Sequence, residues 1–135
     1  MIGELSKEMI DVMLETIPFE FSIIDADDKV LAWNRHDTRL FKRPKGVLGK
    51  DVRNCHPKKS LHLVEKIVQE MKDGERDKAR FWIDLRLGDG EKKNKVLIEY
   101  YALRNSNGKY LGCMEVSKDI TEIQEIKGEK RLLEE

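Results

Sequence analysis

The stretch "ARFWIDLRLGDGEKKNKVLIEYYALRNSNGKYLGCMEVSKDI", residues 79–120, decides the fold because it contains three successive runs that are typical of β-strands. In residues 79–87, apolar side chains alternate with charged or aromatic ones, which is the period-two pattern of a half-buried strand. Two further strands are expected within 95–104 and 110–120. An Asn-Gly pair between them supplies the positive backbone angles of a tight hairpin. The C-terminal half therefore predicts three antiparallel strands.

The N-terminal part of the chain predicts a helix, a hairpin and a second helix. Apolar residues at steps of three and four predict a helix over residues 1–17, which Pro18 ends. Two β-rich runs joined by acidic turn residues predict a hairpin over 19–34. Residues 35–56 are interrupted by proline and glycine and predict short helical turns. After Pro57 an apolar stripe predicts a longer helix, with Leu61, Val64, Val68 and Met71 on one face.

The C-terminal segment, residues 122–135, predicts an exit helix. Ile123, Ile126 and Leu133 lie on a thin helical stripe that is too narrow for a core and that suits pairing with another helix. The helix expected over 1–17 carries a similar stripe. A monomer would leave both stripes exposed, so the sequence predicts a homodimer.

Length and composition limit the classes of protein to which this chain can belong. A chain of 135 residues fits one domain. Lys+Arg and Asp+Glu are both 26, so the formal net charge is zero and no global field attracts nucleic acid or an acidic membrane. No apolar run approaches the roughly 20 residues that cross a bilayer, and the N-terminus lacks the apolar block of a signal peptide. We expect a cytoplasmic protein with neither nucleic-acid nor membrane partners.

Motifs of enzymes and of structural metal sites are missing from the sequence. It contains no glycine-rich phosphate loop, HExxH or GxSxG motif, and its three scattered histidines do not form a believable triad. Cys55 and Cys113 lie far apart without CxxC spacing, which argues against a structural zinc site and a disulfide scaffold. We expect no enzymatic activity.

The order of elements and several short motifs resemble the PAS sensor domain over nearly the whole chain. "VLGKDV", residues 47–52, precedes a His-Pro pair, a helix and three strands, and "DIT", residues 119–121, stands at the exit. The resemblance implies an α+β fold: a five-stranded antiparallel sheet with short helices over one face and flanking N- and C-terminal helices. The PAS domain would span 18–121, between a flanking helix over 1–17 and an exit helix over 122–135.

A narrower resemblance is to the PAS domain at the C-terminus of bacterial and archaeal proteins that also carry a hemerythrin-like segment. Residues 43–67 and "GEKRLL", residues 128–133, carry this similarity. It implies a sensing or signalling module whose terminal helices pass changes to a partner domain or to a second copy. We therefore expect a partner domain in a longer native protein, and nothing in the resemblance implies catalysis.

The stretch "HPKKS", residues 56–60, is similar to a His-Pro-x-Lys-Ser stretch in the haem-binding PAS domain of carbon-monoxide-responsive transcription regulators. The histidine of that motif is an axial iron ligand, so the similarity implies that His56 would be the metal ligand of a haem here. The alternative is structural. Pro57 suits the first position of a helix and His56 would then lie at its cap.

The remaining candidate cofactor-binding residues lie on the expected strands. The second haem ligand of those regulators is a methionine on the strand after the helix, where this chain has Phe81, Trp82 and Ile83, so Met114 on the last strand is a conjectural substitute. Cys113 beside it is expected in the core or the pocket lining. With few polar anchors expected, the pocket would suit a flat or fatty molecule.

Basic residues near position 43 are expected to be solvated. Lys42, Arg43 and Lys45 form a cluster of the kind that usually covers an exposed face.

Two functions follow from the sequence. The first is a sensory or regulatory PAS module that binds a small ligand, either haem or an unidentified apolar molecule, and signals by dimerisation. The second is a ligand-free protein–protein interaction module with a filled core. Bound ligand or its absence distinguishes the two.

Overall fold

The computed structural model describes residues 1–133 and contains one five-stranded antiparallel sheet in the order β2-β1-β5-β4-β3. This sheet and the α+β class confirm the fold expected from the sequence. The strands are β1 (Glu20–Asp25), β2 (Val30–Trp33), β3 (Lys78–Arg86), β4 (Lys93–Arg104) and β5 (Tyr110–Asp119). The helices are α1 (Lys7–Thr16) and α2 (Leu61–Lys72), and 3-10 turns cover His36–Thr38, Lys45–Val47, Val52–Cys55 and Ile123–Glu125.

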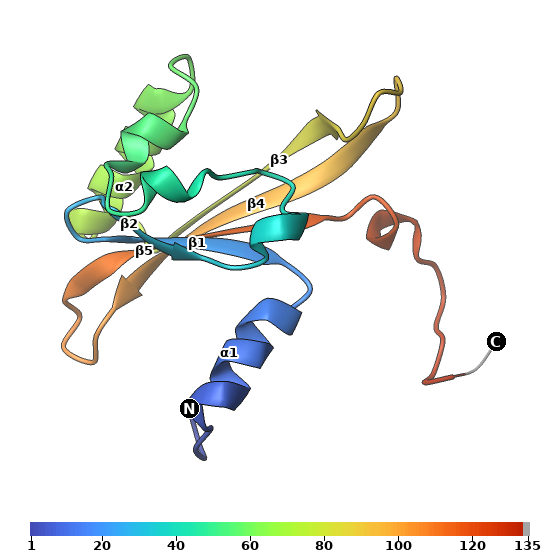
Figure 1. Ribbon diagram of the computed structural model, residues 1–135, viewed down its shortest axis with the longest axis horizontal. Coiled ribbons are helices and arrows are strands. Elements are labelled where there is room, and N and C mark those ends of the chain that lie inside the picture. The colour runs from blue at the N-terminus through green and yellow to red at the C-terminus, as the bar shows by residue number, and fades with distance from the viewer. Residues whose placement is uncertain (134–135) are drawn as a thin grey trace.

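The two helices lie on opposite sides of the sheet. Figure 1 shows α2 and the 3-10 turns between β2 and α2 above the sheet, while α1 and the segment after β5 extend below it. We call the face towards α2 the inner face and the opposite one the outer face. The inner face is thus covered by α2 and the 3-10 turns, whereas α1 and the exit segment leave most of the outer face uncovered.

The core lies between the inner face and α2. Side chains of a strand alternate between the two faces, and on β4 Val96, Ile98 and Tyr100 are buried on the inner face. α2 contributes three buried residues at helical spacing, Val64, Val68 and Met71, as the sequence predicts. Burying these apolar side chains stabilises the contact between helix and sheet.

The longer helix begins later than Pro57. Residues 58–60 form turns, in which the backbone N–H of Ser60 donates to the carbonyl of Pro57 at 3.1 Å, and α2 begins at Leu61. Pro57 is therefore not the first helical residue and His56 does not cap α2. The physical reason is that the apolar stripe itself starts at Leu61, so packing against the sheet stabilises the helix only from there.

The N-terminal helix is shorter than the expected 1–17. It begins at Lys7 because the Ser6 side chain accepts a hydrogen bond from the backbone N–H of Met9 at 3.1 Å. It ends at Thr16, before Pro18. None of its residues is buried, so it is an extension from the core.

The exit helix expected over 122–135 is not present in the described residues. Ile123–Glu125 form a single 3-10 turn, Ile126 is extended and Gly128 adopts a left-handed φ of 66°. A helix of this length gains its stability from packing of its apolar stripe, and here Ile123 and Ile126 are 47% and 73% exposed. Residues 134–135 of the predicted helix lie outside the described residues.

Candidate functional site

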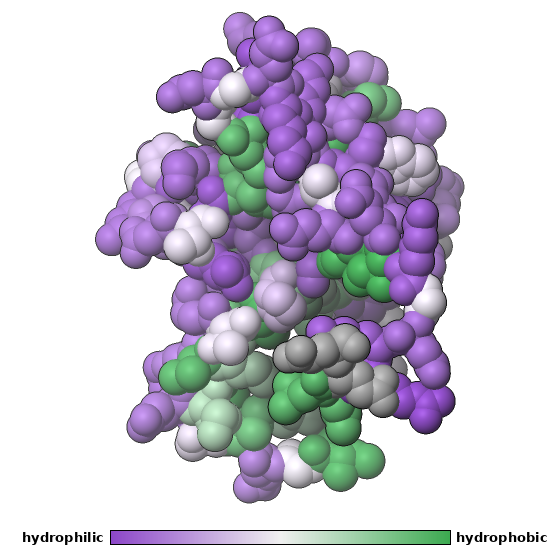
Figure 2. Space-filling view, turned by 90° about the vertical axis from the view of Figure 1, so that its right-hand side faces the viewer, coloured by the Kyte–Doolittle hydropathy of each residue, from purple (hydrophilic) through white to green (hydrophobic). Residues whose placement is uncertain are grey.

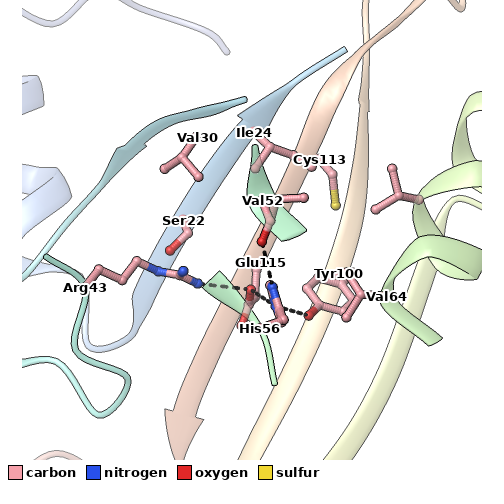
Figure 3. Close-up of a pocket in the computed structure, with 11 residues that line it drawn as sticks. Ser22, Ile24, Val30, Arg43, Val52, His56, Val64, Tyr100, Cys113 and Glu115 are labelled. Atoms are coloured by element: carbon pink, nitrogen blue, oxygen red, sulfur yellow. Dashed lines mark hydrogen bonds and ion pairs between the residues drawn. The ribbon is translucent and has the colours of Figure 1, made fainter. Parts of the chain in front are cut away.

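A pocket lies between the inner face of the sheet and the wall formed by α2 and the Val52–Cys55 turn (Figure 3). Its volume is about 20 Å³. Since one water molecule needs roughly 10–15 Å³ of such volume, the pocket as it stands holds about one water. The lining residues are Ser22, Ile24, Val30, Arg43, Val52, His56, Val64, Val68, Tyr100, Cys113 and Glu115.

Four polar side chains converge at one end of this pocket, and we call them the polar cluster: Arg43, His56, Tyr100 and Glu115. Figure 3 shows them pointing toward one another from a loop, a turn and two strands. Arg43 Nη2 lies 3.3 Å from Glu115 Oε2, and His56 Nε2 lies 3.9 Å from the same oxygen. The cluster therefore brings a cation, a carboxylate, an imidazole and a phenol together at one end of the pocket.

The tautomer of His56 follows from its neighbours. Nδ1 lies 3.1 Å from the carbonyl oxygen of Val52, which only accepts hydrogen bonds, so Nδ1 carries the proton. In the neutral ring Nε2 is then an acceptor, and it faces the Tyr100 hydroxyl at 3.5 Å. The imidazole is thus oriented by the turn that carries it, with its acceptor nitrogen directed at the sheet.

Arg43 is buried, although the sequence predicts a solvated basic cluster. Its side chain is 8% exposed, and its Nε has no hydrogen-bond partner among the described residues. A solvated face was expected because nothing in the local pattern distinguishes Arg43 from the lysines beside it. The loop geometry, which no local pattern reports, turns this one side chain inward.

A second buried ion pair fixes the loop that carries Arg43. Arg39 Nη2 lies 3.1 Å from Glu20 Oε2, and the two side chains are 2% and 4% exposed. Arg39 also donates to the carbonyls of Phe21 and Asn34 and to the Ser22 hydroxyl. Nearly every polar atom of this pair has a hydrogen-bond partner. The pair therefore holds the loop after β2 against β1 and places Arg43 at the pocket.

Burial keeps two further pocket groups in their neutral forms. The pKa of the Tyr100 hydroxyl is raised far above its usual value, mainly by burial and secondly by the charge of Glu115. The same two causes raise the pKa of the Cys113 thiol to about 12. Tyr100 is therefore a neutral donor near neutral pH, and Cys113 is an unreactive thiol.

The structure brings only part of the predicted binding residues together. His56 and Cys113 line the pocket. Phe81 packs against the Tyr100 ring, with centroids 5.6 Å apart, and Ile83 follows on the same face of β3. These four share the inner side of the sheet.

Trp82 and Met114 lie on the outer face, away from His56. Trp82 is 63% exposed, and Met114 lines a groove on the far side of the sheet. The reason is strand alternation: Met114 follows the inward-facing Cys113, and Trp82 follows the inward-facing Phe81. Met114 therefore cannot oppose His56 across a common ligand.

A haem does not fit the residues of this pocket. Its volume of about 20 Å³ is far below that of a macrocycle. The free ring nitrogen, His56 Nε2, faces a hydroxyl and a carboxylate, whereas an iron ligand needs an open approach.

The outer face carries a larger, apolar groove of about 500 Å³ beside α1. We call it the outer groove; its lining residues are Leu14, Ile17, Phe19, Phe21, Ile23, Leu97, Glu99, Tyr101, Met114, Val116 and Lys118. Figure 2 shows hydrophobic side chains gathered at the lower end of the molecule, where α1 and the exit segment lie. Neither described helix is long and apolar enough to cross a membrane.

Comparison with protein families gives a match to the model of the PAS domain over residues 10–121. The chain belongs to the PAS domain family. PAS domains are generally sensory or regulatory modules without catalytic activity, and the inner pocket of this PAS domain is formed between its sheet and α2. The association with a hemerythrin-like segment stays a prediction.

Solved structures give the same fold. The C-terminal domain of a Streptococcus mutans protein is 28% identical, with a TM-score of 0.81, and the match covers 94% of each chain. The PAS domain of Bordetella pertussis BvgS is 20% identical, with a TM-score of 0.63, over 87% of this chain and 88% of that one. A sensory box sensor histidine kinase from Vibrio cholerae is 14% identical, with a TM-score of 0.57, over 85% and 91%. Comparison with curated proteins found no match.

Proposed function

We propose that this PAS domain is a cytoplasmic sensory or regulatory module that binds a small molecule in the inner pocket and signals through a homodimer. The observation that carries the proposal is the polar cluster, in which the buried Nε of Arg43 has no partner among the described residues. Leaving a buried donor unpaired costs about 1–3 kcal/mol. A molecule in the pocket that accepts from this nitrogen would recover that free energy.

The pocket is a better candidate for a polar ligand than for the flat, apolar one expected from the sequence. Apolar residues of β1, β2 and α2 line one end, and the polar cluster lines the other. A concave site of this kind binds the apolar body of a ligand and orients it through a few polar groups.

Ligand binding is tested by a fragment screen that is followed by two-dimensional NMR. We expect chemical-shift changes to concentrate on the pocket residues. In the control variant Val64→Leu, one added methylene would fill the small cavity, and binding would weaken while the fold is kept. Shift changes that are absent, or that persist unchanged in Val64→Leu, would contradict binding in this pocket.

The second candidate function is a ligand-free interaction module. The small volume of the inner pocket, about 20 Å³, favours it because a single water could satisfy the cluster. Under this hypothesis no fragment class binds the pocket, yet the protein still dimerises.

The outer groove supports the homodimer in both cases. α1 has no buried residue, and its apolar side chains stand beside an apolar sheet face. A second copy that brings its own α1 and outer face would cover both surfaces.

A further inference from the structure

The charges around the inner pocket are balanced. Arg43 is paired with Glu115, and Arg39 is paired with Glu20. The four side chains are between 2% and 16% exposed, so water screens them poorly. The pocket therefore presents equal positive and negative charge and, at its polar cluster, both hydrogen-bond donors and acceptors.

This balance discriminates between ligands by their charge. A buried anion would pair with Arg43 but lie beside the carboxylate of Glu115. A buried cation would pair with Glu115 but lie beside the guanidinium of Arg43. Each would leave one charge without a partner, and burying an unpaired charge is costly. A neutral molecule with an acceptor and a donor side by side satisfies Arg43 and Glu115 together.

We infer that the inner pocket selects neutral, planar molecules that carry an amide-like acceptor and donor, and that the pair Arg43–Glu115 sets this preference. The inference rests on the proposed binding function and names its ligand class. In this arrangement the ligand's carbonyl oxygen accepts from the unpartnered Nε of Arg43, while its N–H group donates to Glu115. The apolar residues of β1, β2 and α2 contact the body of the ligand.

The wall that carries His56 is able to open for such a molecule. At its N-terminal end this wall is held from a distance, because the Val52 N–H donates to the Asp28 carbonyl at 2.8 Å and the Arg53 side chain pairs with Asp28 and Glu65. Beyond Arg53, the backbone N–H groups of Asn54, Ser60 and Leu61 donate locally, to the carbonyls of Asp51, Pro57 and Lys58. Segments held by local bonds open at low free-energy cost compared with strands of a sheet. Displacing residues 54–60, which carry His56, would enlarge the pocket without breaking a strand pairing.

Four ligands of matched shape test the inference: benzamide, benzoate, benzamidine and toluene. The first three share a phenyl ring and a planar polar group but differ in charge, and toluene lacks the polar group. We expect NMR titration to give benzamide an affinity at least roughly tenfold above the other three, which corresponds to about 1.4 kcal/mol.

Variants of the ion pair should change which of these ligands the pocket binds most tightly. In Glu115→Gln the positive charge of Arg43 is left over, so benzoate should become the preferred ligand. In Arg43→Gln the carboxylate is left over, so benzamidine should be preferred. Glu91→Gln, in the exposed turn between β3 and β4, is the matched control and should keep the preference for benzamide.

The double variant Arg43→Gln/Glu115→Gln restores balance and should again prefer benzamide, which also covers the case that a single variant fails to fold. Benzoate or toluene binding the unmodified protein as tightly as benzamide would overturn the inference while leaving the pocket as a binding site. Failure of all four ligands also overturns it, and the broader fragment screen then decides the proposed function separately.

Discussion

At the scale of single residues, burial decides what Arg43, His56 and Cys113 can do. Each belongs to a residue type that is commonplace on a surface or in a core, and each acquires a particular role from neighbours that are distant in the sequence. Glu115, for example, lies 72 positions from the arginine that it pairs with. The predictions that follow concern these residues.

Glu115→Gln is expected to destabilise the fold. It removes the partner of a buried cation, and breaking a buried ion pair typically costs about 3–5 kcal/mol because the remaining charge stays buried. The 16% exposure of the Glu115 side chain places the expected loss at the lower end. Urea unfolding measures it. A loss no larger than that of the control Glu91→Gln, in the exposed turn between β3 and β4, would contradict a buried, functioning pair.

Haem is expected to bind neither the protein nor its His56→Ala variant at stoichiometric occupancy. The pocket volume of about 20 Å³ and the orientation of His56 Nε2 oppose it. Expression with haem available and a visible spectrum test this. A Soret band that depends on His56 would show that the wall opens far enough for a macrocycle and would restore the sequence-based hypothesis.

Cys113 is expected to make the fold less stable at alkaline pH. Burial raises the pKa of its thiol from 9.0 to about 12, so the folded state retains a proton that the unfolded state loses. Stability should therefore fall as pH rises from about 9 to about 12. Urea midpoints across this range, compared with those of Cys113→Ala, measure the contribution. Equal slopes in both proteins would show that the thiol does not contribute.

At the scale of elements, α1 is joined to the sheet by polar contacts. Asn34, which is 2% exposed, follows β2 and donates to the carbonyl of Leu14 in α1 at 2.7 Å. It also accepts from the backbone N–H of Phe21 in β1 at 2.7 Å. Since α1 buries no side chain of its own, this amide is a main attachment of the helix to the fold.

Asn34→Ala is therefore expected to release α1. The amides of α1 should exchange with deuterium faster, and the free energy of unfolding should fall by about 2 kcal/mol because buried backbone partners are left unpaired. Asn105→Ala is the control, since Asn105 accepts only within the exposed turn before β5. Unchanged exchange in α1 would mean that other contacts hold the helix.

At the scale of the whole molecule, the two faces of the sheet carry different chemistry. The inner face has a small polar pocket, and the outer face has a wide apolar groove next to α1. Under the proposed function, this arrangement separates ligand binding from association, with the sheet between them. Side chains of adjacent residues, such as Cys113 and Met114, belong to the two different sites.

The homodimer is tested on the outer face. Met114→Lys places a charge in the apolar groove and should convert a dimer to a monomer, because burying an unpaired ammonium at the interface is costly. Light scattering at tens of micromolar measures the mass. Leu63→Lys, at an exposed position of α2, should leave the dimer intact. A monomer in the unmodified protein would contradict the proposal.

The sequence by itself determined the elements whose signal is local. Alternation in residues 79–87 predicts β3, the Asn-Gly pair predicts the turn before β5, and the apolar stripe from Leu61 predicts α2. These patterns suffice because a strand or an amphipathic helix is stabilised by the period of its own side chains.

Only the tertiary structure decided the site and the ends of the chain. Arg43 and Glu115 meet because the Glu20–Arg39 pair folds the loop after β2 back onto β1. The exit stripe forms no helix among the described residues, where its side chains Ile123, Ile126 and Leu133 are largely exposed. In both cases the conformation depends on contacts between residues that are far apart in the chain. A sequence pattern describes only residues that are close together in the chain.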